Sequence, residues 1–329
     1  MLAVQPSSIK RAAENRRPAR TALPNWRREQ RRAFTFGLLP ALLVLVAITL
    51  GPTIYLIVTS LTPLDPVHPH SAADFSDPIG NYRALMADRR FLNSLEVQLK
   101  LSAATVVLQL AVGLGVALLL NAGSRFLEAV RTAFILPMVL PPIVVAVVWK
   151  VIFTPDVSPM HRALTAIGLP VHSLIANPDT ALGAIAVADT WEWFPFTMLM
   201  VLASLQMIPA EPIDAARIDG AGRLALFRYI LFPYIRPTLV VAGLFRLIDS
   251  IKAFPLIYVL TNGGPGTATE VTNYYAFVES FNFSYWGYGS AIATLMVAGV
   301  LLLSWLIGRL GVGVLGQRRS RQRYRGGRG

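Results

Sequence analysis

Three side chains that could bind a hydroxyl-rich solute lie inside apolar segments of the chain. Glu192 and Trp193 interrupt one segment, and Asp249 interrupts another. Carboxylates accept hydrogen bonds from hydroxyl groups, and an aromatic face covers the apolar face of a pyranose ring. An ionisable residue inside a membrane segment is a functional candidate by default. These side chains therefore indicate a binding site for a polar solute.

Each candidate also has a purely structural interpretation. Arg246, Asp249 and Lys252 recur at every third residue, so they could instead pair with one another along one helix. Trp191 and Trp193 could be packing or membrane-interface aromatics. The sequence leaves both interpretations open.

Catalytic and metal-binding patterns are not evident. The chain has no cysteine, which excludes disulfides, thiolate metal sites and cysteine nucleophiles. No Ser/His/Asp arrangement or carboxylate pair is recognisable as catalytic, although an enzyme using Asp189, Glu192 and Asp249 is a competing hypothesis. His68 and His70 lack carboxylates at metal-ligand spacing, so no metal site is expected.

The apolar residues that must position these groups come in long blocks. Of the 329 residues, 54% are hydrophobic and 15% charged, against about 25% charged in soluble domains. A helix needs about 20 mostly apolar residues to cross a bilayer. Six blocks meet this length, which predicts an all-α membrane protein; they are 34–61, 94–121, 132–153, 180–207, 239–261 and 289–313.

The +12 net charge is largely a topology signal. Nine basic residues lie in the tail 1–33 and six follow Arg309, and an even number of spans places both tails on one side. Short cytoplasmic loops are rich in Lys and Arg, so both termini are expected in the cytoplasm. Contact with anionic lipid is expected for the tails, whereas nucleic-acid binding is not, because no recognition motif accompanies the arginines.

A connection of unusual length, 208–238, follows the fourth block on the cytoplasmic side. Pro209 and Pro212 favour the start of a helix there, and Gly220 or Gly222 could end it. A second short helix is expected to follow and to stop at Pro233. The small residues of the first helix would let another backbone approach closely, but the hairpin could equally lie on lipid.

This connection resembles the EAA loop of the permease subunits of bacterial ABC importers. The match runs through Asp214-Ala215-Ala216, Gly220, Phe227, Ile230, Pro233 and Pro237. The segment Leu260-Thr261-Asn262-Gly263-Gly264-Pro265-Gly266 is similar to a loop of the carbohydrate-uptake class, which includes the maltose-transporter permeases. Gly80-Asn81-Tyr82 through Asn93-Ser94 resembles the segment before the second span of that class, and the pattern covers most of 34–316.

The resemblance implies the type I importer permease fold, with six transmembrane helices and a cytoplasmic coupling helix in the bacterial inner membrane. It implies a permease domain over 34–316 between basic tails 1–33 and 317–329. The partners it implies are a second homologous permease, an ATPase dimer and an extracytoplasmic solute-binding protein. ATP and Mg²⁺ would be bound by the ATPase, because none of the four lysines follows the glycine that a phosphate loop requires.

The resemblance also implies roles for particular residues. The ATPase-coupling surface would be Asp214, Ala215, Ala216, Asp219, Gly220 and Ala221. The solute path would include Met138, Pro142, Glu192, Trp193, Phe196, Asp249, Ser250 and Ala253. The binding protein would dock at Asn262, Gly263, Gly264 and Pro265, although Gly-Gly-Pro-Gly is also a plain turn sequence.

The function implied is inward passage of a sugar or polyol, with no catalytic or metal site in this chain. The same architecture importing a glycerophosphodiester or another non-sugar solute is the alternative. Secondary transport by inverted repeats is a further option, but the halves show no clear self-similarity and the EAA loop would be unexplained.

Overall fold

The computed structural model describes residues 26–121, 125–155, 157–168 and 173–325. The chain forms two compact units, residues 1–55 and 56–329, and the second contains most of the helices. Helix α2 (Trp26–Ser60) begins in the first unit and carries Pro40 and Pro52 in its interior. The last eight residues of the expected N-terminal tail, 26–33, therefore belong to a helix.

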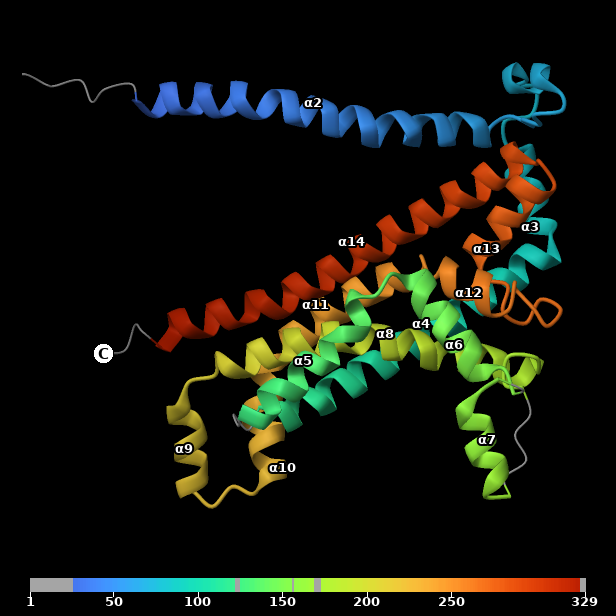
Figure 1. Cartoon of the computed structure of the whole chain (residues 1–329). Helices are drawn as coiled ribbons and strands as arrows, with labels where there is room; N and C mark the ends of the chain where they lie inside the picture. The colour runs from blue at the N-terminus through green and yellow to red at the C-terminus, as the bar shows by residue number, and fades with distance from the viewer. Residues whose placement is uncertain (1–25, 122–124, 156, 169–172, 326–329) are drawn as a thin grey trace, which may run out of the picture. The chain divides into compact units, whose positions relative to one another are not determined.

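Helices make up nearly all of the described part of the second unit (Figure 1). The outer segments include the short helices η1 (Pro69–Ala73), α3 (Gly80–Ala87) and α7 (Pro159–Ala166). The longer elements are α4 (Arg89–Leu120), α5 (Arg125–Val139), α6 (Pro142–Phe153), α8 (Pro178–Gln206), α11 (Phe232–Ser250) and α14 (Trp286–Arg325). The elements α9 (Ala210–Ile218), α10 (Arg223–Leu226), η2 (Phe227–Leu231), α12 (Phe254–Leu260), α13 (Thr272–Phe277) and η3 (Val278–Asn282) complete the described part.

Five described helices are long and apolar enough to cross a membrane, and a bent pair makes six. The predictions of an all-α membrane protein and of spans near 34–61, 94–121, 180–207 and 289–313 are therefore confirmed within small shifts of the boundaries. The structural spans are Phe36–Ser60, Arg89–Leu120, Pro178–Gln206, Arg223–Ser250 and Trp286–Leu306.

The third expected span, 132–153, is not one straight helix. It is a pair, Ala129–Val139 and Pro142–Phe153, bent by 100° at its break. Pro141 caps α6 in an extended conformation, with ψ of 137°, and Pro142 follows it. A proline cannot donate a backbone hydrogen bond and disfavours helix at the residue before it, so two in succession end α5 and start α6.

The fifth expected span, 239–261, was placed too late in the chain. The apolar helix runs over Arg223–Ser250, and the break at 251–253 separates it from α12. The prediction that a short helix stops at Pro233 was also wrong. Pro233 lies in the first turn of α11, directly after the π-helical turn η2, where its missing N–H does not interrupt the helix.

Helix α8 lies at the centre of the second unit. It packs most extensively against α4 and also contacts α11, α5, α12 and α6 (Figure 1). Gly113 of α4 permits an unusually close approach, because a β-carbon there would lie 2.6 Å from Cβ of Thr197. Small residues at such crossings let helix backbones approach closely in membranes.

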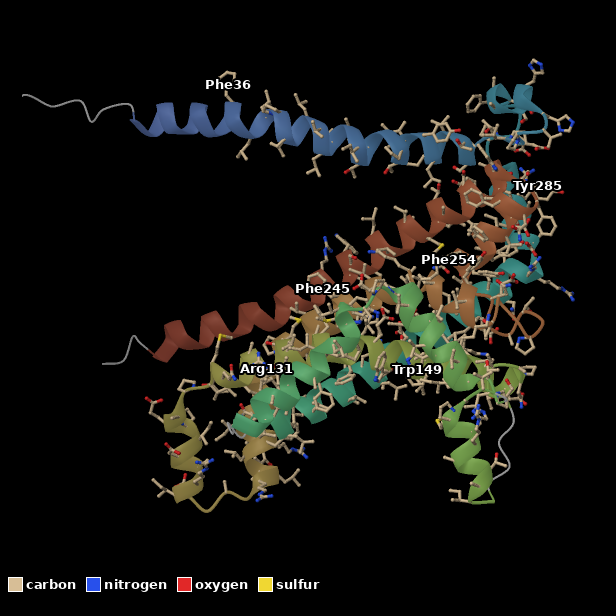
Figure 2. All side chains as sticks on the ribbon, viewed as in Figure 1. Phe36, Arg131, Trp149, Phe245, Phe254 and Tyr285 are labelled. Atoms are coloured by element: carbon tan, nitrogen blue, oxygen red, sulfur yellow. The ribbon has the colours of Figure 1, made fainter. Side chains whose placement is uncertain are left out.

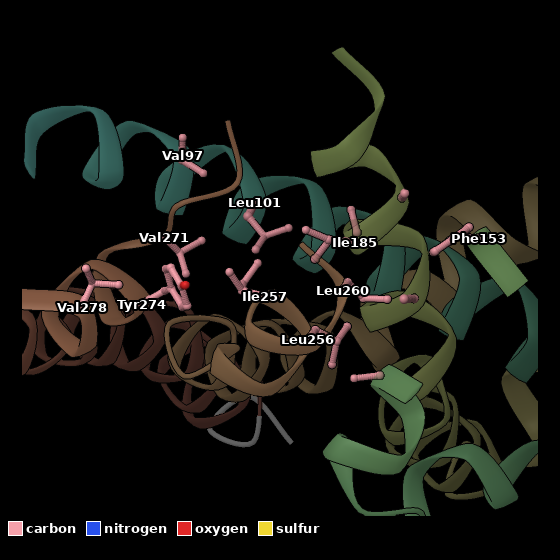
Figure 3. Packing of buried hydrophobic residues seen from close by; sticks show 14 residues of the cluster. Val97, Leu101, Phe153, Ile185, Leu256, Ile257, Leu260, Val271, Tyr274 and Val278 are labelled. Carbon is pink, nitrogen blue, oxygen red and sulfur yellow. The ribbon is translucent and has the colours of Figure 1, made fainter. Parts of the chain in front are cut away.

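The largest buried hydrophobic cluster joins residues far apart in the sequence (Figure 3). Val97 and Leu101 of α4 meet Ile185 of α8 and Ile257 of α12 there, with Val271 beside them. This cluster packs α12 and the segment around Val271 against α4 and α8. The cluster thereby joins α8, which carries several candidate site residues, to α4 and α12.

The connections gather at two opposite ends of this unit (Figure 1). The turn α9–α10 lies toward the same end as the last turns of α14, whereas α3, α12 and α13 lie toward the other. The connection 208–238 and the Gly-Gly-Pro-Gly loop are thus at opposite ends, as the charge distribution predicts for loops on opposite sides of a membrane.

Candidate functional site

Aromatic and charged side chains of α8 and α11 meet at their shared interface. The ring of Phe196 lies edge to face against Phe245, with centroids 6.2 Å apart. The guanidinium carbon of Arg246 lies 4.4 Å from the ring centroid of Trp193. Trp193 and Phe196 are one turn apart on α8, so both reach the same partner helix. Of the expected solute-path residues, Trp193 and Phe196 are therefore brought together with α11.

A buried polar network supports this interface from α4. The amide nitrogen of Gln109 donates to Oδ2 of Asp189 at 2.6 Å, and the amide oxygen of Gln109 accepts from Nε of Arg246 at 2.8 Å. None of the three residues is more than 4% exposed. A buried charge is costly unless hydrogen-bonded partners surround it, and this network supplies them for Arg246. Sequence reasoning did not find the role of Gln109 or the contacts of Arg246 with Gln109 and Trp193.

Glu192 lies close to this network but outside its hydrogen bonds. The residue is 1% exposed, and neither carboxylate oxygen has a hydrogen-bond partner among the described residues. Such a group inside a span is normally paired or serves function. The burial of Glu192 leaves its hydrogen-bonding capacity unused in this conformation.

Asp249 forms the ion pairs of the alternative interpretation. Its carboxylate lies 3.3 Å from Nη1 of Arg246 and 3.6 Å from Nζ of Lys252. The ion ladder, in which Arg246, Asp249 and Lys252 pair along one helix, is thus present, as one of the two interpretations of the sequence predicted. The side chain of Asp249 is nevertheless 44% exposed, so its pairing leaves it accessible to a further ligand.

The other expected path residues lie at helix ends and breaks. Ser250 is buried, and its hydroxyl donates to Ser102 at 2.8 Å, while Ala253 is half-buried in the break before α12. Met138, half-buried, and Pro142, exposed, flank the bend between α5 and α6.

An aromatic contact joins α6, the second helix of the bent pair, to α8. Trp149 of α6, labelled in Figure 2, packs edge to face on Trp191 of α8, with centroids 5.8 Å apart. Trp191 is therefore a packing residue between these helices, as one of the two interpretations of the sequence predicted.

The expected coupling helix is α9, and it has no buried residue. Its end matches the glycine signal, because Gly220 has a φ of +79° and its N–H donates to the carbonyl of Arg217 at 3.1 Å. Ile218 and Leu224 beside this turn are 87% and 78% exposed. A surface with exposed apolar residues of this size suits contact with another protein or with lipid. Of the expected coupling residues, Asp214, Ala215, Asp219 and Gly220 are exposed, and Ala216 and Ala221 are half-buried.

The Gly-Gly-Pro-Gly loop at the opposite end is held by its own hydrogen bonds. The backbone N–H of Thr269 donates to the carbonyl of Gly263, and the hydroxyl of Thr269 donates to that of Gly264 at 2.7 Å. Gly263 has a φ of +80°, and a β-carbon there would lie 2.7 Å from the ring of Tyr274. The loop presents a fixed shape. Of the expected docking residues, Asn262 is exposed, Gly264 and Pro265 are half-buried, and Gly263 is buried.

An arginine that sequence reasoning did not single out ties this loop to α4. Arg90 donates from Nε and Nη2 to the carboxylate of Glu270, at 2.8 and 2.7 Å. Its Nη1 lies 3.8 Å from Glu279, whose pKa is raised by burial although Arg90 opposes the shift. A bidentate Arg–carboxylate pair fixes orientation as well as distance. Arg90 and Glu270 are 180 residues apart, so no local pattern announces the pair.

Asp88 adds further hydrogen bonds beside the Arg90–Glu270 pair, at the start of α4. Its carboxylate accepts hydrogen bonds from the hydroxyls of Tyr275 and Tyr288, at 2.5 and 2.6 Å, and caps α4 through the N–H of Arg90. Burial raises the pKa of Asp88, but these hydrogen bonds outweigh it and leave the pKa below its ordinary value. The first turn of α4 is thereby joined to α13 and α14.

Replacing Glu270 with alanine is expected to loosen the attachment of the Gly-Gly-Pro-Gly loop to α4. The Arg90 side chain is 40% exposed, so solvent screens part of its attraction to Glu270. The free energy of unfolding should therefore fall by about 1–3 kcal/mol, which is less than for the loss of a fully buried pair. Thermal unfolding of the purified chain in detergent measures it.

The control for Glu270→Ala is an exposed ion pair on α4, the helix that carries Arg90. Glu96→Ala breaks the exposed pair of Glu96 with Lys100. That change should cost about 0.5 kcal/mol or less, because exposed pairs contribute little. Equal shifts for Glu270→Ala and Glu96→Ala would contradict the anchoring role.

Metal ligands do not cluster in the described residues, where no group of three or more His, Asp and Glu side chains could hold an ion. The ring of His68 instead pairs with Asp65 at 3.1 Å. The ring nitrogens of His161 are buried and have no hydrogen-bond partner among the described residues. His172 lies outside the described residues.

Long apolar helices that enclose buried, hydrogen-bonded polar groups are the features of a multi-pass membrane protein with a polar interior. Residues 109–315 match the family described as the binding-protein-dependent transport system inner membrane component. The chain belongs to this family, and it is a multi-pass protein of the inner membrane.

Curated relatives support the family membership. The trehalose/maltose transport system permease protein MalF of Thermococcus litoralis is 36% identical over 71% of this chain and 78% of its own length. The sulfoquinovosyl glycerol transport system permease protein SmoG of Agrobacterium fabrum is 32% identical over 84% and 90%. The trehalose transport system permease protein SugA of Mycobacterium tuberculosis is 30% identical over 86% and 89%.

Solved structures show the same fold. A chain of a bacterial ABC transporter involved in the import of the acidic polysaccharide alginate matches with a TM-score of 0.75, at 20% identity, over 87% of this chain and 97% of that chain. The expectation of an ABC importer permease fold is therefore confirmed.

Proposed function

We propose that this chain is the permease of an ATP-driven importer that passes a sugar inward across the membrane. The observation that carries the proposal is that relatives matching over most of their length are named as permeases for trehalose, maltose and sulfoquinovosyl glycerol. Glu192, Trp193 and Asp249 supply chemistry that suits such a solute, since carboxylates accept hydroxyl hydrogen bonds and an indole covers a sugar face.

The proposed path runs along the α8–α11 interface. Trp193, Phe196 and Asp249 are partly exposed there, whereas Glu192 is sealed. Exposure of Glu192 would follow a change between two packed arrangements of the helices, as expected for alternating access. The path would also be lined from the bend and from the break before α12, by Met138, Pro142, Ser250 and Ala253.

The energy would come from partner subunits. The exposed helix α9 and Gly220 would dock on an ATPase dimer, with Asp214, Ala215, Ala216, Asp219 and Ala221 in the contact. A second homologous permease would complete the path, and a solute-binding protein would dock at Asn262, Gly263, Gly264 and Pro265. Both termini would then be cytoplasmic, with the basic tails near lipid headgroups.

Reconstitution tests the proposal. The chain is co-expressed with a second permease and an ATPase of the same importer class, and the complex is placed in liposomes with a solute-binding protein of that class. We expect trehalose or maltose to stimulate ATP hydrolysis. Stimulation by glycerophosphocholine or amino acids alone would overturn the sugar assignment and keep the importer, and activity of the chain without an ATPase would overturn both.

Replacing Glu192 with glutamine tests the buried carboxylate. If the carboxylate accepts a sugar hydroxyl, its loss should cost about 1.5–3 kcal/mol, or about 10- to 100-fold in uptake of the transported sugar. Asp179→Asn removes an exposed carboxylate from the first turn of the same helix and should leave uptake unchanged. Normal uptake by Glu192→Gln would reduce Glu192 to a packing residue.

A further inference from the structure

One buried cation contacts two of the proposed solute ligands at once. Arg246 is 1% exposed, its Nη1 lies 3.3 Å from the carboxylate of Asp249, and its guanidinium covers the ring of Trp193 at 4.4 Å. Asp249 and Trp193 are both partly exposed. Arg246 is therefore shielded behind groups that a solute could touch.

The Nε donor of the Arg246 guanidinium is directed away from the proposed solute site. Nε of Arg246 donates to Gln109 of α4 at 2.8 Å, and Gln109 in turn donates to Asp189 of α8 at 2.6 Å. The guanidinium is thus fixed by α4 and α8 while it belongs to α11. Its place is set by three helices that are far apart in the sequence.

The chemistry of this cluster requires arginine. A guanidinium is planar, stacks on an aromatic face and donates in several fixed directions, whereas an ammonium is a compact point charge. Only a planar fork can stack on Trp193, pair with Asp249 and donate to Gln109 in one position. The ladder interpretation accounts for Asp249 but not for the contacts with Trp193 and Gln109.

We propose that Arg246 is the positioning residue of the solute site, which fixes Trp193 and Asp249 relative to each other and thereby sets which sugar the site accepts. The selectivity part of this proposal rests on the proposed function. The positioning part is tested at Trp193 and is measurable without a solute.

The selectivity experiment compares Arg246→Lys with the unchanged chain in the reconstituted complex. Initial uptake of trehalose and of maltose is measured for both, and the ratio of the two rates is the readout. We expect the ratio to change about tenfold, as for the loss of one charge-assisted hydrogen bond. Arg83→Lys, at an exposed pair with Asp77, is the matched control and should leave the ratio unchanged. A merely structural role for Arg246 would lower both rates alike.

The positioning experiment uses tryptophan fluorescence of the purified complex, with acrylamide as quencher. The contribution of Trp193 is the difference between spectra with and without Trp193→Phe, recorded in the unchanged chain and in the Arg246→Lys variant. We expect Arg246→Lys to shift this contribution and increase its quenching.

The two readouts separate the failure of this proposal from the failure of the proposed function. If the unchanged complex moves neither sugar, the proposed function fails, and the Trp193 signal alone decides the positioning role. An unchanged Trp193 contribution in the Arg246→Lys variant overturns the positioning role, and an unchanged uptake ratio in a complex that transports overturns the selectivity role.

Discussion

Gly113→Leu is expected to prevent correct packing of the central helices. A β-carbon at this position would lie 2.6 Å from Cβ and 2.8 Å from Cγ2 of Thr197, and 3.0 Å from the backbone nitrogen of Met198. Because a backbone atom is among the obstacles, a rotamer change of Thr197 does not relieve the clash. Overpacking of a core typically costs about 1–3 kcal/mol, and here the helices α4 and α8 must separate.

The measurement for Gly113→Leu is the folded fraction of the purified chain. Size-exclusion chromatography in detergent and the midpoint of thermal unfolding should both show a large loss. Gly115→Leu is the matched control, since it lies two residues further along the same helix and a β-carbon there meets no described residue within 4 Å. If the two variants behaved alike, the close α4–α8 approach would not be essential to the fold.

Gly220→Val is expected to abolish uptake while the chain still folds. Gly220 has a φ of +79°. For a residue with a side chain, this left-handed conformation costs about 1–2 kcal/mol. A β-branched residue should change the path of the chain where α9 ends, and so displace the proposed ATPase-docking surface. A β-carbon at Gly220 would meet no described residue within 4 Å, so the fold itself has little reason to respond.

Sugar-dependent ATP hydrolysis by the reconstituted complex, with the amount of ATPase retained on the purified chain, checks the effect. We expect at least a tenfold loss of coupled uptake, equivalent to about 1.4 kcal/mol in docking. Gly222→Val is the control, because a β-carbon at Gly222 also meets no described residue within 4 Å, and its φ of −69° is ordinary. Full uptake by Gly220→Val would contradict the coupling role of this turn.

Signals confined to one stretch of sequence were predictable. Hydropathy located most of the spans, because a membrane helix must be apolar over its own length. Gly220 ended α9 as expected, because the requirement for positive φ is local. The ladder of Arg246, Asp249 and Lys252 also follows from helix periodicity alone.

Features that depend on distant partners were not predictable. The prolines at 141 and 142 indicate a break, but the 100° bend depends on the packing of α5 and α6 against α8. Gln109 gave no signal of its role, because its partners Asp189 and Arg246 lie 80 and 137 residues away. An amide in an otherwise apolar span is the one local hint, and it does not identify the partner.

The π-helical turn η2 sets the angular phase between α10 and α11, which it joins without a break. A π-helical turn holds one residue more than the α-helical pattern, and each residue of an α-helix rotates the chain by about 100°. Because Phe227–Leu231 runs directly into α11, the rotation that η2 introduces is carried along the helix to Phe245 and Arg246. This extra residue therefore affects which side chains of α11 face α8. Hydropathy alone does not reveal this rotation of the helix about its axis.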